Sequence, residues 1–532
     1  MTTITFYSYK GGVGRSLVVA NVAKYLQRFG QKVFTLDFDL EAPGLHYKFA
    51  LGPEDKLDAI DQGVVDLIYT FCTTGKMPDS LSRFAIQLGE PNSTAGRIWL
   101  MPAGKVPTAE YWRRLARISW HEMFYSESAP GIPLFLELKH RIEDEFNPDF
   151  LLIDSRTGIT EVGGVATTVL PDKVVCLAMK NRENLEGARE VLRSIKRAPR
   201  LPTQTAIQIL PVLTRIPELG PEAEETILKQ VKEFLNEEAS DLSSTLNVDV
   251  VFILHSESDL EVTEAIRVGG KMSADQSPLL RDYLRLFTRL ISREVVDPYL
   301  APLIQEALVK GFEDPTGAER DLRAIADYSG HAQAYRALLK FYRMRRAGTK
   351  ALKVAEQLWD LSGHSNDPLV WEIVQRYFPP ASKGHREDWQ QGQKDPPFNQ
   401  DFVEAIWMAA GSNDEQVGLE LARSFENSKG QHRAAAILRK LLPNASSGEI
   451  AVKIITLLLE LPDLPSAQAA FESLKEQLKS TPAFQTIWGQ VVLASKDKTK
   501  IQKLLENPDF DSRALATDDF AVLAELSTRI DQ

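Results

Sequence analysis

Short apolar runs alternate with longer amphipathic stretches over the first 295 residues of the chain. The run Phe150-Leu151-Leu152-Ile153 is apolar at every position, as is typical of a strand buried on both faces. Such runs predict strands at Thr3–Ser8, Lys32–Asp37, Arg97–Met101, Phe150–Asp154, Lys173–Met179, Ala206–Leu213 and Val248–Leu254. Helical spacing predicts helices at Leu17–Phe29, Leu134–Glu145, Glu183–Arg197, Pro221–Asn236 and Leu279–Glu294. The alternation predicts an α/β domain over residues 1–295, a mostly parallel sheet with helices on both faces.

This pattern is interrupted once and then ends. Residues from about 52 to 96 are less regular, which predicts an insertion with one helix near Asp61–Phe71. After about Val296 no strand pattern remains, and helical stretches follow one another between turns such as Asp314-Pro315 and Leu442-Pro443-Asn444. We therefore expect a second, all-α domain over residues 296–532.

One part of the helical region has the spacing of a tetratricopeptide (TPR) repeat. The small and large apolar positions of that repeat are matched by Tyr335, Leu338, Leu339, Tyr342, Ala351, Ala355 and Leu358. This match predicts a TPR-like solenoid, an architecture that offers extended concave surfaces to protein partners. An irregular helical bundle is the alternative that the pattern leaves open.

Composition narrows the class of protein. The formal net charge is -11, which argues against wholesale electrostatic binding to DNA or anionic lipid, although basic stretches at residues 193–200 and 340–346 leave a local patch open. Two distant cysteines, Cys72 and Cys176, predict no disulfide and suit a reducing cytosol. No signal pattern or long apolar run is present, so we expect a cytoplasmic protein without a membrane span.

A glycine-rich loop, Lys10-Gly11-Gly12-Val13-Gly14-Arg15-Ser16, stands between the first predicted strand and the first predicted helix. Glycines let backbone N–H groups approach a phosphate closely, and the helix after the loop adds the positive end of its dipole. The Ser16 hydroxyl stands where such loops ligate Mg²⁺. Strand, loop and helix in this order predict a P-loop nucleotide site.

Acidic residues follow two of the predicted strands. Asp37 and Asp39 close the second strand, and Asp154 closes the strand Phe150–Asp154 after four apolar residues, which is the Walker B pattern. The carboxyl ends of strands in an open parallel sheet face the ligand crevice. We therefore expect these three carboxylates to lie beside the phosphate loop.

The loop resembles the deviant Walker A motif, KGGxGK[ST], of the MinD/ParA family of ATPases. The resemblance spans about residues 1–293 and departs from the motif at Arg15, where the family has lysine; the variant KGGVGR is associated with a bacterial subgroup. It implies that Lys10 reaches the phosphates of a partner subunit in a nucleotide-sandwich dimer. It also implies that residues Gly11 to Leu17, including Val13, hold the nucleotide, with Arg15 on the phosphates of its own chain.

The same resemblance implies roles for the acids and for later loops. Asp39 would position the attacking water, and Mg²⁺ would be held by Ser16, Asp37 and Asp154. Gly158 would sense the γ-phosphate through its amide, in a loop where Arg156 either pairs with a carboxylate or phosphate or is an ordinary surface arginine. Thr214 and Arg215 would contact the base, and because the family usually has asparagine where Thr214 stands, the choice between ATP and GTP stays open.

These implications predict a slow, Mg²⁺-dependent ATP hydrolase that acts as a nucleotide-gated switch. ATP would close a homodimer, and the helical domain would engage a protein partner, with bacterial signalling or anti-phage defence as a candidate setting. Two alternatives remain at this stage. One is a scaffold that keeps nucleotide without hydrolysing it, and the other is a partitioning or positioning ATPase like ParA or MinD.

Overall fold

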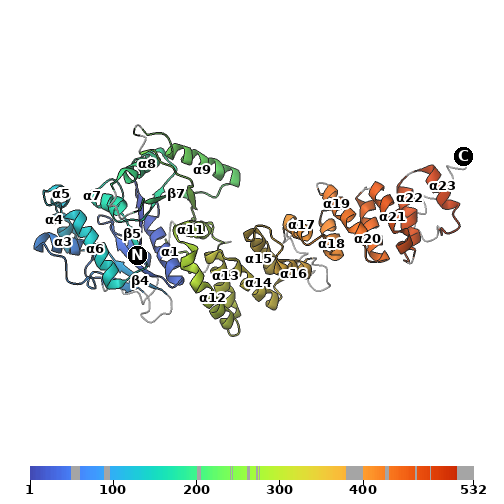
Figure 1. Ribbon diagram of the computed structural model, residues 1–532, viewed down its shortest axis with the longest axis horizontal. Coiled ribbons are helices and arrows are strands. Elements are labelled where there is room, and N and C mark those ends of the chain that lie inside the picture. The colour runs from blue at the N-terminus through green and yellow to red at the C-terminus, as the bar shows by residue number, and fades with distance from the viewer. Residues whose placement is uncertain are drawn as a thin grey trace. The chain divides into compact units, whose positions relative to one another are not determined.

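The computed structural model divides the chain into two compact units, residues 1–329 and residues 330–532 (Figure 1). It describes residues 1–511 except 50–59, 89–95, 200–204, 240, 242–243, 261–263, 271–273, 275, 379–398, 426–429, 462–463, 480 and 496. The first unit has the α/β organisation predicted from the sequence, and the described residues of the second are helical.

The sheet of the first unit has the strand order β3-β4-β2-β5-β1-β6-β7-β8. Neighbouring strands are parallel except β3 and β4, which pair antiparallel at one edge. The strands are β1 Thr2–Ser8, β2 Lys32–Asp37, β3 Ile86–Leu88, β4 Arg97–Met101, β5 Phe150–Asp154, β6 Lys173–Ala178, β7 Gln208–Ile216 and β8 Phe252–His255. The mostly parallel sheet is thereby confirmed.

Strand β8 begins four residues later than the sequence pattern predicts. Asn236 follows helix α9 (Pro221–Leu235). Its side-chain amide accepts a hydrogen bond from the Val248 backbone N–H at 2.8 Å and donates one to the Val248 carbonyl at 3.0 Å. Both backbone groups of Val248 are therefore used by the end of a helix, and the strand starts only beyond them, at Phe252. An apolar run alone does not reveal this competition.

Helices cover both faces of the sheet (Figure 1). Ile4 and Phe6 of β1 face a core shared with α1 and α11, whereas Tyr7 of the same strand packs with α8 and α9. A third cluster joins β2 and β5 to α3 and α6. Among the described residues of the unit, the helices are α1 Arg15–Arg28, α2 Leu45–Phe49, α3 Val64–Thr74, α4 Ala109–Arg117, α5 Trp120–Tyr125, α6 Gly131–Phe146, α7 Glu161–Gly164, a π-helix Val165–Val169, α8 Arg182–Arg197, α9 Pro221–Leu235, α11 Pro278–Leu290, α12 Arg293–Lys310 and α13 Pro315–Ser329.

The region expected as an irregular insertion, about 52–96, is only partly described. Residues 52–59 and 89–95 lie outside the described residues. The part between them contains α3 and β3, and β3 adds an antiparallel edge strand to the sheet. At three residues, β3 is too short for its pattern to be distinguished from a loop.

Helix α12 begins at Arg293 and runs past residue 295, and α13 follows it, yet both belong to the first unit. The predicted helix Leu279–Glu294 ends at Leu290, and a new helix starts at Arg293. Tyr328 of α13 belongs to the core around α1, and its backbone carbonyl accepts a hydrogen bond from the Tyr25 hydroxyl at 2.8 Å. The compact unit therefore extends 34 residues past 295, to Ser329, because α13 completes the core on which α1 rests.

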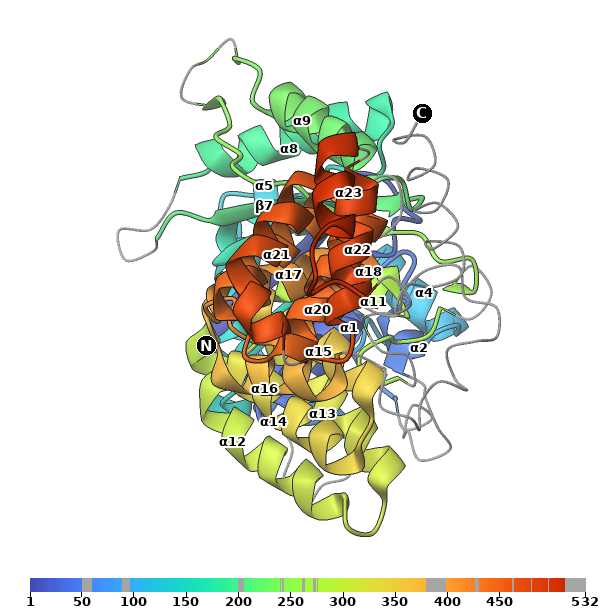
Figure 2. The ribbon, with the colours of Figure 1, turned by 90° about the vertical axis from the view of Figure 1, so that its right-hand side faces the viewer.

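The described helices of the second unit follow one another from α14 to α23 along Figure 1, and Figure 2 views them from the α23 end. Neighbouring helices pack against each other, notably α14 with α15, α18 with α19 and α20 with α21. The bounds are α14 Ala332–Arg345, α15 Gly348–Leu361, α16 Pro368–Tyr377, α17 Gln400–Ala409, α18 Glu415–Ser424, α19 Gln431–Leu441, a 3₁₀ turn Leu442–Asn444, α20 Gly448–Glu460, α21 Leu464–Leu478, α22 Phe484–Ala494 and α23 Lys498–Leu505.

The segment with TPR-like spacing forms the pair α14 and α15. All its predicted small and large positions are buried, from Tyr335 on α14 to Leu358 on α15. The predicted all-α region is confirmed for the residues that the structure describes. Among them, no helix combines the length and the apolar character needed to cross a membrane.

Candidate functional site

The glycine-rich loop lies between β1, which ends at Ser8, and α1, which begins at Arg15. Gly12 and Gly14 have φ of 76° and 81°, a conformation that side chains other than glycine's rarely adopt. A Cβ added at Gly11, Gly12 or Gly14 would meet no atom within 4 Å, so the loop borders open space. The first turn of α1 carries no acidic residue and no side-chain cap, which leaves its N–H groups free for an anion.

The apolar residues of the loop and of the first turn of α1 attach it to the hydrophobic core. Val13 and Leu17 are buried in the core beneath the loop, whereas Ser16 is half-buried. The open side of the loop therefore lies at its glycines, with the half-buried Ser16 next in the chain. This arrangement fits a phosphate chain.

Three carboxylates gather beside this loop. Asp37 and Asp154 end the adjacent parallel strands β2 and β5 and are partners in register. Asp37 is fully buried, and its two oxygens accept hydrogen bonds from the backbone N–H groups of Asp39 at 3.1 Å and Leu45 at 3.2 Å. Burial, reinforced by the nearby Asp154 charge, raises the pKa of Asp37 well above its usual range. Asp37 thus holds the backbone that carries Asp39.

Arg15 bridges two of these acids. Its Nε donates to Asp154 Oδ1 at 2.5 Å, and its Nη2 donates to Asp39 Oδ2 at 2.6 Å. The third nitrogen, Nη1, donates to Ser8 Oγ at 3.2 Å, and only 6% of the side chain is exposed. Burial by itself would lower the pKa of Arg15, but the charges of Asp154 and Asp39 outweigh it and raise the pKa. The guanidinium is therefore a charged, fully engaged part of the site.

The donor set fits a hydrated magnesium ion. Asp154 is fully buried, yet its Oδ2 has no hydrogen-bond partner while Oδ1 receives Arg15. A buried carboxylate oxygen without a partner is costly, which makes it suited to accept from metal-bound water. Ser16 and Asp154 are the residues that would hold Mg²⁺ from this side of the loop.

The loop after β5 is tied to both neighbouring segments. Arg156 Nη1 donates to Glu41 Oε1 at 2.5 Å, so Arg156 pairs with a carboxylate. The Gly158 N–H donates to the Tyr9 carbonyl at 3.1 Å, and the Gly158 carbonyl accepts from the Tyr7 hydroxyl at 3.1 Å. The Gly158 amide is therefore engaged by the chain itself, and the predicted bond to a phosphate would require this bond to open.

Lys10 points to the rim of the site. Its Nζ lies 2.6 Å from Glu183 Oε1 in the first turn of α8, and both side chains are exposed. The hydrogen bond with Glu183 raises the pKa of Lys10. Because exposed ion pairs are weak, Lys10 is easily released to another anion.

A pocket of about 200 Å³ opens next to the loop, lined among others by Val13, Gly14, Thr214, His255 and Tyr283. Thr214 is 3% exposed, and its hydroxyl has no partner, so one polar atom of the wall is unused. Both residues predicted to contact the base line this pocket, but they differ in exposure. Thr214 is buried, whereas Arg215 is exposed and has a positive φ of 56°. The pocket borders the glycine-rich loop directly, because Val13 and Gly14 form part of its wall.

His255 was not identified from the sequence. Its Nδ1 lies 2.7 Å from Asp282 Oδ2, and its Nε2 lies 3.0 Å from Glu224 Oε1. Burial would lower the pKa of His255, but the hydrogen bond with Glu224 and the charge of Asp282 outweigh it and raise the pKa. The three residues come from β8, α9 and α11, and no short motif records such a meeting.

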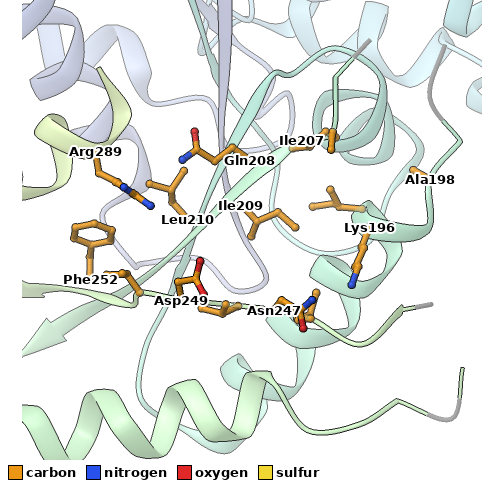
Figure 3. Close-up of a pocket in the computed structure, with 15 residues that line it drawn as sticks. Lys196, Ala198, Ile207, Gln208, Ile209, Leu210, Asn247, Asp249, Phe252 and Arg289 are labelled. Atoms are coloured by element: carbon orange, nitrogen blue, oxygen red, sulfur yellow. The ribbon is translucent and has the colours of Figure 1, made fainter. Parts of the chain in front are cut away.

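Another pocket lies at the opposite end of the sheet, where β7 and β8 begin (Figure 3). It has a volume of about 400 Å³ and is lined by residues that include Lys196, Gln208, Asp249 and Arg289. None of the residues predicted for nucleotide binding lines it. The predicted residues instead meet at the carboxyl ends of the strands.

The amino-acid sequence matches one family model. Residues 4–212 match the CobQ/CobB/MinD/ParA nucleotide binding domain, which covers the glycine-rich loop, the three carboxylates and the strands from β1 into β7. No curated protein matches the chain.

The solved structures that the chain matches include three that are covered almost over their full length. MinD of Pyrococcus horikoshii, complexed with Mg-ADP, is 16% identical over 55% of this chain and 96% of its own, with a TM-score of 0.37. The MinC:MinD complex of Aquifex aeolicus is 19% identical over 55% of this chain and 95% of its own, with a TM-score of 0.34. A ParA family ATPase of Chlorobium tepidum is 16% identical over 56% of this chain and 98% of its own, with a TM-score of 0.34.

Proposed function

Because residues 4–212 match the CobQ/CobB/MinD/ParA nucleotide binding domain, we propose that this protein is a slow ATPase that works as a switch. In this proposal the first unit binds ATP with Mg²⁺ and pairs with a second copy of the chain. The helical unit then engages a protein partner in one nucleotide state and releases it in the other. A bacterial signalling or defence pathway is the setting we propose for this switch.

One observation carries the proposal. The open glycine loop, the unpaired Oδ2 of buried Asp154 and the half-buried Ser16 meet at one end of the sheet. Backbone N–H groups of the loop would bind the phosphates, and Asp39 would orient a water molecule for attack. Bound Mg²⁺ supplies charge neutralisation at the phosphates. Positioning of this kind provides most of the rate in phosphoryl transfer.

The exposed position of Lys10 supports the pairing of two copies. Its carboxylate partner, Glu183, is itself exposed, so the ammonium group lies at the outer rim of the loop. Because an exposed ion pair is weak, the ammonium group can exchange Glu183 for a phosphate bound by another molecule. We therefore propose that Lys10 leaves Glu183 and completes the site of the second copy when ATP is bound.

The test combines light scattering after size exclusion with phosphate release. The full chain is measured without nucleotide, with Mg-ADP and with Mg-ATP, alongside Lys10→Ala and Asp39→Ala. We expect a dimer only with Mg-ATP, loss of the dimer in Lys10→Ala, and loss of phosphate release with retained dimer in Asp39→Ala. Arg182→Ala is the matched control, because Arg182 is an exposed cation in the first turn of the same helix as Glu183.

Two results would count against the switch. A single species in all three nucleotide states, with no phosphate release, would remove both dimerisation and hydrolysis. Loss of the dimer in Arg182→Ala to the same extent as in Lys10→Ala would show that general surface charge, and not the signature lysine, controls association.

A scaffold that binds nucleotide without hydrolysis is a second candidate. The observation that favours it is the position of Arg15, whose guanidinium holds Asp39 at 2.6 Å and so restrains the residue proposed to orient water. If this ion pair persists with nucleotide bound, ATP stays intact. Equal partner binding by the wild type and by Asp39→Ala, with unchanged ATP affinity, would favour the scaffold.

A positioning ATPase that binds DNA or lipid receives less support from the basic stretches. Arg193 pairs with Glu190 and donates to the Glu237 carbonyl, and Lys196 donates to the Thr245 carbonyl. Arg343 of the second stretch pairs with Glu372. Cations already used inside the protein are poorly placed to release counterions from a nucleic acid. Salt-sensitive retention on nonspecific DNA would revive this candidate.

A further inference from the structure

The ion pairs of Arg15 place a cation among the residues proposed to hold Mg²⁺. Arg15 contacts Asp154 and Asp39 at 2.5 and 2.6 Å, and its third nitrogen is taken by Ser8. The pairs are buried, with 6% of Arg15 and none of the Asp154 side chain exposed. Buried charges of opposite sign at this distance interact strongly, because little water separates or screens them.

Whether the carboxylates of Asp39 and Asp154 are neutralised depends on where the Arg15 guanidinium lies. Asp37, Asp39 and Asp154 lie together, and among the described residues Arg15 is the cation that pairs with Asp39 and Asp154. If nucleotide phosphates attract the guanidinium, the two carboxylates lose their partner. A divalent cation that arrives with the phosphates restores the balance, whereas nucleotide alone leaves buried acids uncompensated.

The identity of the residue is important for this arrangement. The planar guanidinium of arginine presents separate N–H groups, so one side chain bridges carboxylates that follow two different strands. A lysine carries its charge on a single nitrogen at the end of a flexible stem. The arginine at position 15, where the resembling motif has lysine, therefore gives a site that is closed by its own cation.

We infer that Arg15 is the internal counter-ion of this site, which keeps Asp39 and Asp154 from binding a divalent cation until phosphates draw the guanidinium away. The inference rests on the proposed nucleotide site, and it adds that a divalent cation and nucleotide enter together. It concerns residues of this chain in the absence of nucleotide, so it can be tested without ATP.

The test measures binding of Mn²⁺, a paramagnetic substitute for Mg²⁺, to the full chain without nucleotide by electron paramagnetic resonance. Arg15→Met and Arg15→Gln remove the charge, and the second keeps an amide donor in case the first variant does not fold. A neighbouring unit charge changes the proton affinity of a carboxylate by about 10- to 1,000-fold, and we expect Mn²⁺ to respond in the same direction. Affinity should therefore rise at least about tenfold over wild type in both variants.

Arg156→Met is the matched control, because Arg156 also pairs with an acid, Glu41, but is one-third exposed. Its Mn²⁺ affinity should equal that of the wild type. The inference is overturned if a folded neutral variant of Arg15 binds Mn²⁺ no more tightly than the wild type, or if Arg156→Met gains as much. Because no nucleotide is added, failure here is distinct from failure of ATP-dependent dimerisation.

Discussion

Replacing Tyr328 by alanine should destabilise the nucleotide-binding unit, although this residue lies well beyond the α/β pattern of the sequence. Tyr328 is 2% exposed, its ring packs 6.3 Å from that of Tyr25, and its hydroxyl accepts a hydrogen bond from the Gly269 N–H at 2.8 Å. Truncating a buried aromatic side chain to alanine costs about 3–5 kcal/mol. We expect a loss of about 4 kcal/mol, within that range.

This free energy converts to a change in melting temperature. Unfolding entropy is about 2.1 cal/mol/K per residue, so a unit spanning residues 1–329 unfolds with about 0.7 kcal/mol/K. A loss of about 4 kcal/mol then lowers its Tm by about 6 °C. Tyr328→Phe keeps the ring and removes only the acceptor of the Gly269 amide, which should cost about 1–2 kcal/mol.

Calorimetry of the full chain gives the Tm, and hydrogen exchange followed by mass spectrometry assigns the loss to a unit. Peptides from α1 and α13 should lose protection together in Tyr328→Ala. Tyr342→Ala is the matched control, because Tyr342 is a buried tyrosine on α14 of the second unit. The reasoning is refuted if Tyr328→Ala lowers protection only after residue 330, since α13 would then belong energetically to the helical unit.

Three further outcomes are expected from single residues. Thr214→Val removes a buried hydroxyl that has no partner, so stability should hold while nucleotide affinity falls about tenfold in fluorescence titration, the value of one hydrogen bond; unchanged affinity would show that Thr214 does not read the base. The pKa of His255 is raised above 6.5, so its contribution to stability is full below that pH and declines as pH rises through the folded pKa. As the pH rises from 6.5 through the folded pKa, the urea midpoint of the wild type should therefore decrease relative to that of His255→Gln. The same pH dependence of the midpoint in both proteins would contradict this prediction. Trp407→Ala removes a fully buried indole whose Nε1 donates to the Asp414 carbonyl, which should cost the helical unit about 3–5 kcal/mol in thermal unfolding and leave nucleotide affinity intact.

Local pattern was sufficient to predict the elements that hold the site. Strand β5 and its terminal Asp154 follow from four consecutive apolar residues and one acid, and the phosphate loop follows from glycines between a strand and a helix. These features are determined within a few neighbouring residues. Their convergence follows from parallel strands, whose carboxyl ends share one edge of the sheet.

Contacts between distant residues could not be predicted in this way. The Tyr25 hydroxyl meets the Tyr328 carbonyl across 303 positions, and His255 meets Glu224 and Asp282 from separate helices. Neither contact alters the local spacing of apolar residues, so the sequence pattern cannot predict it. The bridge formed by Arg15 is of the same kind, because the motif identifies the residue but not its partners.

These distant contacts also connect the phosphate loop with the helix that leads into the second unit. Asn21, on the helix that starts at the loop, accepts hydrogen bonds through Oδ1 from the backbone N–H groups of Arg267 and Val268. The next residue, Gly269, donates its N–H to the Tyr328 hydroxyl. The second unit begins at Gly330, two residues after Tyr328. Energetic coupling is carried by contiguous packing and hydrogen bonds between elements with two arrangements. Under the proposed switch, we therefore expect a shift of α1 on nucleotide binding to reach α13, the last helix of the first unit.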